Sequence, residues 1–181
     1  MWMWNRVGLV VAPVITLLFC GCEQKIKPSV LPVTEKAIIP QQESWNSHIV
    51  ISDSGRIKAI VDAGNVKVYE SSKQTLMSEG VVAYFFDEHG KPTSVLTSRE
   101  AKVDEGTNDL EAIGNVLVVS SDSTKLRTER LFWNNQRQLI HSPEFVRITS
   151  SKEKLQGHGF ESDQNLKNYR IYRVTGETVT Q

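Results

Sequence analysis

The sequence predicts a nearly all-β fold. From Ile49 onward, short apolar segments alternate with polar turns, and Ser, Thr and Val are frequent, a composition that favours strands. No stretch after residue 46 keeps the 3.6-residue period of an amphipathic helix over three turns. The tripeptide Gly-Asn-Val occurs at residues 64–66 and again at 114–116, each time ahead of a short apolar segment. These observations indicate strand-and-turn units that repeat along the chain.

The first 22 residues predict an export segment. Arg6 precedes a mostly apolar run over residues 7–19, which is shorter than the roughly 20 residues of a membrane span and matches a secretory signal. A glycine stands directly before Cys22, so the end of the run resembles a bacterial lipoprotein signal, although Phe19 replaces the usual Leu. Three alternatives stay open: cleavage and lipidation at Cys22, an uncleaved membrane anchor, or plain secretion.

Residues 23–48 are expected to form an extended tether, because Pro28, Pro32 and Pro40 interrupt them and no apolar period is sustained. The folded domain is expected over residues 49–181. The chain has no cysteine after residue 22, so this domain needs no disulfide.

The remaining elements follow from the alternation of apolar and polar side chains. Strands are expected at residues 56–62, 65–71, 81–86, 124–134, 139–142, 144–151, 154–160 and 169–179, with a hairpin over 98–116 that turns at 105–108. The strand at 81–86 is apolar on both faces, which predicts burial on both faces or contact with a partner. The strand at 124–134 is either continuous or divided by a kink. Gly90 and Pro92 predict a turn after residue 86.

The two Gly-Asn-Val copies belong to a longer repeat. The segment LEAIGNVLVVSS aligns with IVDAGNVKVYES at an offset of 50 residues, and a weaker third copy places Val146 and Ile148 at an offset of 30 from the second. The continuation after the second copy also resembles the one after the third, with Leu126 matching Leu155. The alternative is that two similar turns arose by coincidence.

The repeated glycines have a predicted structural role. Gly64 and Gly114 are expected at bends or bulges, where a side chain would obstruct the chain. Asn65 and Asn115 are expected to hydrogen-bond the local backbone there.

Three motifs complete the pattern: LxAxGNVxV at residues 110–118, LxTExLxW at 126–133 and GxGF at 157–160. In this order and spacing, behind a short N-terminal anchor segment, they resemble the LptC family. Members of that family are membrane-anchored periplasmic components of the lipopolysaccharide transport machine. The resemblance covers residues 50–175, which is most of the chain.

The resemblance implies an open twisted β-jellyroll of antiparallel strands that holds the acyl chains of lipopolysaccharide between two sheets. It implies two protein partners: permease subunits of the inner-membrane ABC transporter at the N-terminal edge, and an LptA-like periplasmic bridge protein at the C-terminal edge. It also implies a relay that is not an enzyme, needs no cofactor, and lies on the periplasmic side of the envelope, anchored to the inner membrane. Many members have an N-terminal membrane helix, which a lipoprotein-type signal replaces here, and Glu23 after Cys22 keeps outer-membrane anchoring open.

Period-two alternation assigns one face of each strand to the implied trough. The predicted lipid-binding residues are Val66, Val68, Leu96, Ala101, Val103, Leu110, Ala112, Val116, Val118, Leu131, Trp133, Val146, Ile148 and Phe160. Phe85, Phe86 and Phe132 replace some of them if the face of a strand is inverted. Alternatively, the same side chains fill a closed core, because a core and a cleft need the same residue types. The corresponding alternative function is a membrane-tethered structural lipoprotein that acts as a protein–protein adaptor without lipid.

The sequence carries little reactive chemistry. Its 21 basic and 21 acidic residues give a formal net charge of zero, which argues against non-specific nucleic-acid binding. The four histidines are scattered without metal-ligand spacing, and no nucleophile or phosphate-loop motif occurs. Lys152 and Lys154, or Arg170 and Arg173, are candidate contacts for lipid phosphates near an opening, although ordinary surface charge is the simpler interpretation.

Overall fold

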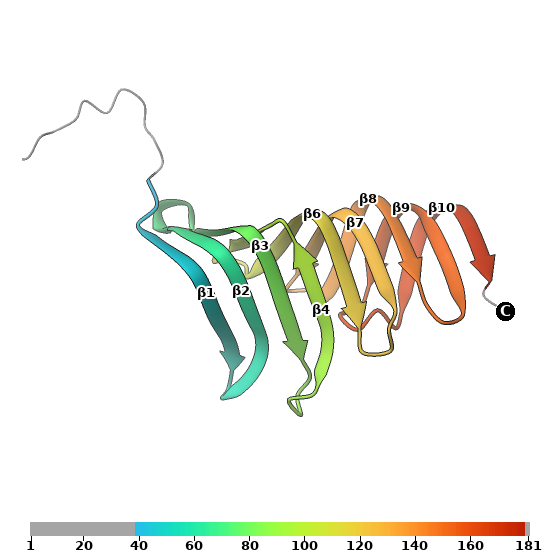
Figure 1. The fold of residues 1–181 in the computed structure, drawn as a ribbon, viewed down its shortest axis with the longest axis horizontal. Coiled ribbons are helices and arrows are strands. Elements are labelled where there is room, and N and C mark those ends of the chain that lie inside the picture. Colours follow the sequence, from blue (N-terminus) through green and yellow to red (C-terminus); the bar gives the residue numbers. More distant parts are fainter. Residues whose placement is uncertain (1–38, 180–181) are drawn as a thin grey trace, which may run out of the picture. The chain divides into compact units, whose positions relative to one another are not determined.

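The computed structural model describes residues 39–179, with side chains up to residue 176, and confirms the predicted all-β class. Within these residues, ten strands form one antiparallel sheet (Figure 1). The strands are β1 (Gln42–Asp53), β2 (Arg56–Tyr69), β3 (Gln74–Phe86), β4 (Pro92–Ser98), β5 (Glu100–Asp104), β6 (Asp109–Ser120), β7 (Lys125–Asn134), β8 (Leu139–Thr149), β9 (Glu153–Ser162) and β10 (Tyr169–Val179), with a short 3-10 turn, η1 (Glu70–Ser72), between β2 and β3.

Neighbouring strands follow the order of the chain, so the sheet is a long meander with β1 and β10 at its two edges. The exception is the pair β4 and β5, which share one place between β3 and β6. Residues 81–86 of β3 pair with β4, and residues 74–77 pair with β5. Both short strands run antiparallel to β3 and are separated only by Arg99, so the break between them divides this place in the sheet into two parts.

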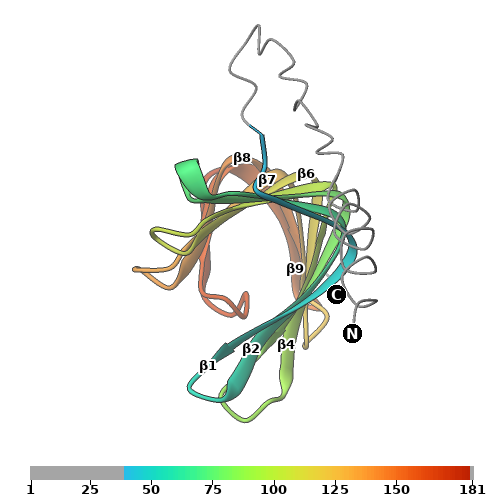
Figure 2. The ribbon, with the colours of Figure 1, turned by 90° about the vertical axis from the view of Figure 1, so that its left-hand side faces the viewer.

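The long strands bend near their middle, where the pairing register shifts. These bends divide the sheet into two leaves, which curve around a common interior when viewed end on (Figure 2). The first leaf contains β4 and residues 56–63, 81–86, 116–120, 125–128, 146–149 and 153–157 of the long strands. The second leaf contains β5 and residues 65–69, 74–78, 109–113, 131–134, 139–142 and 160–162.

Both Gly-Asn-Val copies lie at these bends, which confirms the prediction for Gly64 and Gly114. A Cβ atom on Gly64 would lie 2.6 Å from the carbonyl oxygen of Glu79, so only glycine lets β2 and β3 approach this closely. Gly114 has φ +79° and Asn115 has φ 51°, a left-handed conformation that glycine and asparagine tolerate best. A bulge of this kind turns the strand and re-aims its side chains.

Strand β1 starts earlier than the sequence indicated. Residues 42–48, expected in the tether, form the first half of β1 and pair with β2. The expectation for Asn65 is also corrected, because its Nδ2 donates a hydrogen bond across to Glu43 Oε1 on β1 at 2.9 Å rather than to the local backbone. The apolar pattern missed this half-strand because its side chains are mostly exposed at an edge of the sheet.

Two pairs of predicted strands are each continuous. Residues 56–62 and 65–71 merge into β2, and residues 139–142 and 144–151 merge into β8, because the interruptions are bulges rather than turns. Of the two alternatives for residues 124–134, the structure has one strand, β7, with a register shift between Arg127 and Phe132. Of the two alternatives for residues 81–86, burial of both faces is wrong, since Tyr84 is 39% exposed, and contact with a partner stays a prediction.

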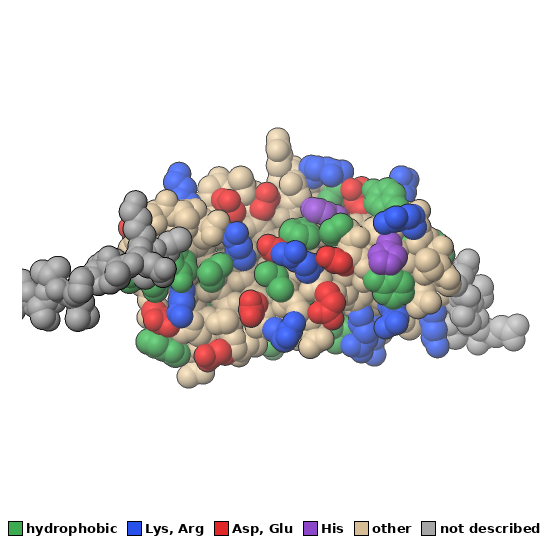
Figure 3. Space-filling model, turned by 90° about the horizontal axis from the view of Figure 1, so that it is seen from above, with side chains coloured by type: hydrophobic (Ala, Val, Ile, Leu, Met, Phe, Trp, Pro, Cys, Tyr) green, Lys and Arg blue, Asp and Glu red, His purple; other side chains and the backbone are tan. Residues whose placement is uncertain are grey.

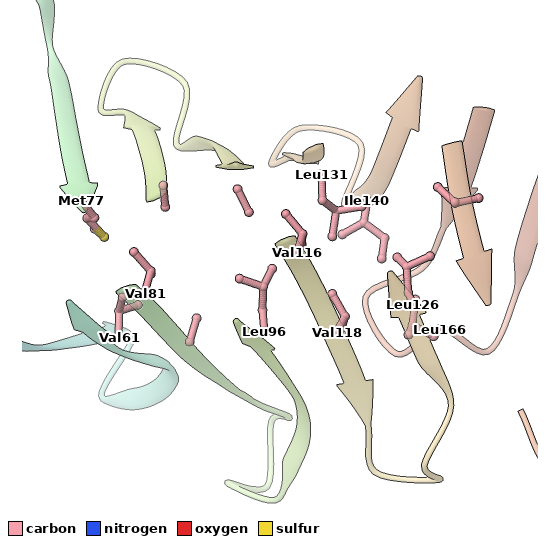
Figure 4. Packing of buried hydrophobic residues seen from close by; sticks show 14 of the residues in the cluster. Val61, Met77, Val81, Leu96, Val116, Val118, Leu126, Leu131, Ile140 and Leu166 are labelled. Atoms are coloured by element: carbon pink, nitrogen blue, oxygen red, sulfur yellow. The ribbon is translucent and has the colours of Figure 1, made fainter. Parts of the chain in front are cut away.

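The hydrophobic core lies between the two leaves (Figure 4). Val81 and Leu96 of the first leaf point toward the interior shared with Met77 and Leu131 of the second leaf. Leu126 is 0% exposed, and full burial of such a side chain contributes about 1.5–3 kcal/mol.

The signal segment 1–22 with Cys22, and the tether up to residue 38, lie outside the described residues. Among residues 39–179, no helix has the length and apolar character needed to cross a bilayer.

Candidate lipid-binding interior

The predicted trough residues do line the interior between the leaves. All of them except Val68 belong to the buried apolar cluster or pack directly against it, and Val68 is half-buried near the end of β2. Of the three replacement candidates, Phe85 packs against the cluster, and Phe86 is half-buried without belonging to it. Phe132 instead stacks on His141. These predicted side chains therefore point inward on the strands that carry them, while what they bind stays a prediction.

The interior also contains apolar side chains that the sequence did not single out for the trough. They are Val61, Ala63, Met77, Val81, Ala83, Leu126, Ile140 and Leu166. The sequence did contain a pattern that could have predicted Leu126 in the interior, because the repeat pairs it with Leu155, which also packs against the cluster. No pattern predicted Leu166, since it belongs to a loop between two strands.

The interior is filled by the protein's own side chains. Ala112, Leu126 and Val146 are each 0% exposed, and Phe160 is 1% exposed. The hydrogen-bonded ladders run within the leaves, whereas these side chains meet across the space between them (Figure 4). Contacts of this type are non-directional and depend on buried apolar area.

The strand-connecting turns form two rims, one along each leaf. The first rim comprises residues 54–55, 87–91, 121–124 and 150–152, and the second comprises residues 70–73, 105–108, 135–138 and 163–168. The fold places the rims on either side of the interior, because every long strand bends between them.

The last loop of the second rim, residues 163–168, inserts an apolar side chain into the interior. Leu166 is 1% exposed and adopts φ 56°, in the left-handed region. Asp163 organises the loop: its Oδ1 accepts the Lys167 N–H at 2.9 Å, and its Oδ2 accepts Asn168 Nδ2–H at 2.7 Å. The loop thus holds Leu166 as a plug near the C-terminal end of the interior.

A hydrogen bond joins the two leaves next to this plug. The Tyr169 hydroxyl donates to Glu153 Oε1 at 2.5 Å. Glu153 begins β9, whereas Tyr169 pairs with Ser162 at the other end of that strand, so the bond spans from the first leaf to the second. Burial, and then the hydrogen bond with the Glu153 carboxylate, raise the pKa of Tyr169 to about 12. The phenol therefore remains a neutral donor at physiological pH.

The outer surface of the C-terminal strands has a different chemistry. Phe132 stacks on His141 with 5.2 Å between ring centroids, and Phe145 meets His158 edge-on at 5.2 Å. Arg147 lies over the Phe145 ring at 5.2 Å. Figure 3 shows hydrophobic, basic and histidine side chains close together toward this end of the surface. No group of three His, Cys, Asp or Glu side chains suited to a metal ion occurs within the described part of the chain.

Each edge strand has a neighbour on one side only. Exposed apolar side chains lie on both edges: Trp45 (62% exposed) and Ile51 on β1, and Tyr172 and Val174 (52% exposed) on β10. Unpaired backbone groups with apolar side chains beside them suit the addition of a strand from another protein.

Comparison with known proteins agrees with this architecture. Residues 16–178 match the model of a family described as "Lipopolysaccharide-assembly, LptC-related". No curated protein matches the chain. The family match spans every strand of the sheet except the last residue of β10.

Proposed function

Because this chain belongs to the LptC-related family of lipopolysaccharide-assembly proteins, and so takes part in lipopolysaccharide transport, we propose that it holds the acyl chains of its cargo between its two leaves. It relays this cargo from the permease subunits of an inner-membrane ABC transporter to an LptA-like periplasmic bridge protein. The family is a transport component rather than an enzyme family. The observation that carries the proposal is the continuous apolar interior between two leaves of one open sheet.

The energetics of this interior suit a lipid. Each buried CH₂ group contributes about 0.8 kcal/mol, so a few acyl chains can be held by apolar area alone. The protein's own side chains fill this interior. Lipid entry therefore exchanges one set of apolar contacts for another, and leaves the hydrogen-bonded ladders intact.

The bends supply a hinge for this exchange. Register shifts lie between the leaves in β2, β6, β7 and β8, and ladder hydrogen bonds are locally disrupted at such bulges. Parting the leaves there costs mainly the apolar contacts between them, which the entering acyl chains restore. The β4–β5 break lies between the two leaves as well.

The two edges of the sheet support two protein partners. We assign β1 to the transporter side and β10 to the bridge side, with anchoring to the inner membrane through the N-terminal segment. Strand addition at both edges would place this interior in line with those of its partners.

An adaptor without lipid is the second candidate, and the filled interior favours it. Buried side chains such as Val116 and Ile148, both 1% exposed, are what a purely structural domain would also show. The two functions differ in whether the isolated protein binds lipid.

The test uses the full chain in a mild detergent, mixed with lipopolysaccharide and examined by native mass spectrometry. We expect a stoichiometric complex that Trp133→Arg weakens, because Trp133 is half-buried against the cluster and a charge there opposes acyl chains. Tyr84→Arg is the matched control, since it adds the same charge on the outer face. Absence of a complex with the folded wild-type chain would leave the adaptor function.

A further inference from the structure

The strongest unassigned feature is a pocket between the two rims near the C-terminal end. Its volume is about 900 Å³. Asp122, Ser150 and Lys152 line it from the first rim, and Leu166, Lys167 and Arg170 line it from the second rim and the adjoining start of β10. The pocket therefore combines a largely polar wall with the apolar plug of the interior.

Three cations on this wall are not engaged in ion pairs. Within residues 39–176, the salt bridges include none of Lys152, Lys167 and Arg170. The sequence had offered Lys152 and Arg170 in separate pairs as candidate phosphate contacts, and the fold brings them to one pocket together with Lys167. Their original companions, Lys154 and Arg173, do not line it.

The carboxylates of the same pocket have partners of their own. Asp122 accepts the Thr124 N–H at 3.0 Å and also the Ser120 hydroxyl, and these hydrogen bonds, the Ser120 one first, hold its pKa below the ordinary value. Glu153 accepts the Tyr169 hydroxyl. Glu161 pairs with Arg137 at 3.2 Å. Only Glu161 is neutralised by a cation, whereas Asp122 and Glu153 keep their negative charges, so the three cations exceed the remaining free carboxylates of the pocket by one positive charge.

One buried polar group in the pocket also has no partner. Ser162 is 2% exposed and lines the pocket, and its Oγ makes no hydrogen bond within the protein. Buried hydroxyls are nearly always hydrogen-bonded, so this atom is available to a polar ligand group. It lies beside the apolar interior, because β9 places Phe160 in the core two residues earlier.

We propose that this pocket binds the phosphate-bearing headgroup of a lipid whose acyl chains occupy the interior. Lys152, Lys167 and Arg170 bind the phosphate, and Ser162 hydrogen-bonds a polar group of the ligand at the junction with the apolar interior. Charge-assisted hydrogen bonds from Lys and Arg to phosphate are stronger than neutral ones. This proposal rests on the proposed function in one respect only, which is that the acyl chains of the ligand occupy the interior.

The test measures the affinity of the full chain, in detergent, for three probes: diphosphorylated lipid A, dephosphorylated lipid A with the same acyl chains, and inorganic phosphate. We expect the diphosphorylated lipid to bind at least about tenfold more tightly than the dephosphorylated one. The double variant Lys167→Gln/Arg170→Gln should remove this preference without changing the affinity for the dephosphorylated lipid. Lys154→Gln/Arg173→Gln, which removes the same charge from outside the pocket, should keep it.

The possible outcomes separate the two proposals. Equal affinity for both lipids, unaffected by Lys167→Gln/Arg170→Gln, would overturn the headgroup pocket and leave the acyl-chain carrier standing. If the chain binds inorganic phosphate but neither lipid, and Lys167→Gln/Arg170→Gln abolishes that binding, the pocket is an anion site and the acyl-chain carrier proposal is overturned. No binding of any probe by the folded chain would overturn both.

Discussion

At the scale of single residues, the hydrogen bond between Tyr169 and Glu153 joins the two leaves at the C-terminal end of the interior. Loss of this hydrogen bond should loosen that end of the fold, because it connects opposite ends of β9 across the interior. Tyr169 also packs against the apolar cluster, so its ring makes apolar contacts in addition to the hydrogen bond of its hydroxyl. Replacement by Phe removes the hydroxyl and keeps the ring.

This bond predicts a specific dependence of stability on pH. The pKa of Tyr169 is raised from the ordinary 10.0 to about 12, so the folded state holds the phenolic proton more tightly than the unfolded chain does. The resulting stabilisation is complete below pH 10 and is lost as the pH rises through 12. Urea denaturation should give the wild type a higher free energy of unfolding than Tyr169→Phe at about pH 9. This difference should vanish at about pH 12.

The control is Tyr172→Phe, an exposed tyrosine on the same strand. A difference between wild type and Tyr169→Phe that stays constant over this pH range would contradict the role of the bond. The individual contact was beyond sequence reasoning, because Glu153 and Tyr169 meet only when β9 bends around the interior.

At the scale of elements, the close approach of β9 and β10 depends on glycine. A Cβ atom on Gly157 would lie 2.1 Å from the carbonyl oxygen of Arg173, which is backbone and cannot move aside. Gly157 belongs to the GxGF motif, and the motif therefore has a packing role in addition to its place in the family pattern. The sequence predicted bends at Gly64 and Gly114 from their repetition, whereas nothing in the pattern indicated the contact at Gly157.

Gly157→Ala should lower the free energy of unfolding by about 1–3 kcal/mol, the usual cost of forcing atoms into a packed region. Hydrogen exchange should show that β10 loses protection before the other strands, because the clash lies between β9 and β10. Gly106→Ala is the control: its Cβ would meet the Asp104 side chain at 3.1 Å and Lys73 Cδ at 3.9 Å, both side chains that can move, in an exposed turn, so the change should stay within about 0.5 kcal/mol. Equal effects of the two substitutions would contradict this account.

At the scale of the whole molecule, the sheet has two distinct edges and one interior. If the edges bind different partners, substitutions on them should act separately. Trp45→Asp on β1 should weaken binding to the transporter's permease subunits by about tenfold or more and leave the bridge protein bound. Val174→Asp on β10 should do the reverse.

Both side chains are more than half exposed, so neither substitution should unfold the protein. Binding of each variant to each partner, measured by surface plasmon resonance with the full chain in detergent, checks the prediction. A loss of both partners from either substitution would argue against two independent edges.

The sequence by itself determined the strand content, the inward face of most strands and the two repeated bends, because each depends on local patterns of side chains. Period-two alternation identified residues such as Val116 and Phe160, and the family motifs identified the class of protein. The tertiary structure decided the features that require distant segments to meet. The Leu166 plug, the bond from Tyr169 to Glu153 and the shared pocket of Lys152 and Arg170 arise only when every long strand bends and brings the two rims together. Alternation along one strand carries no information about that bend or about what lies across it.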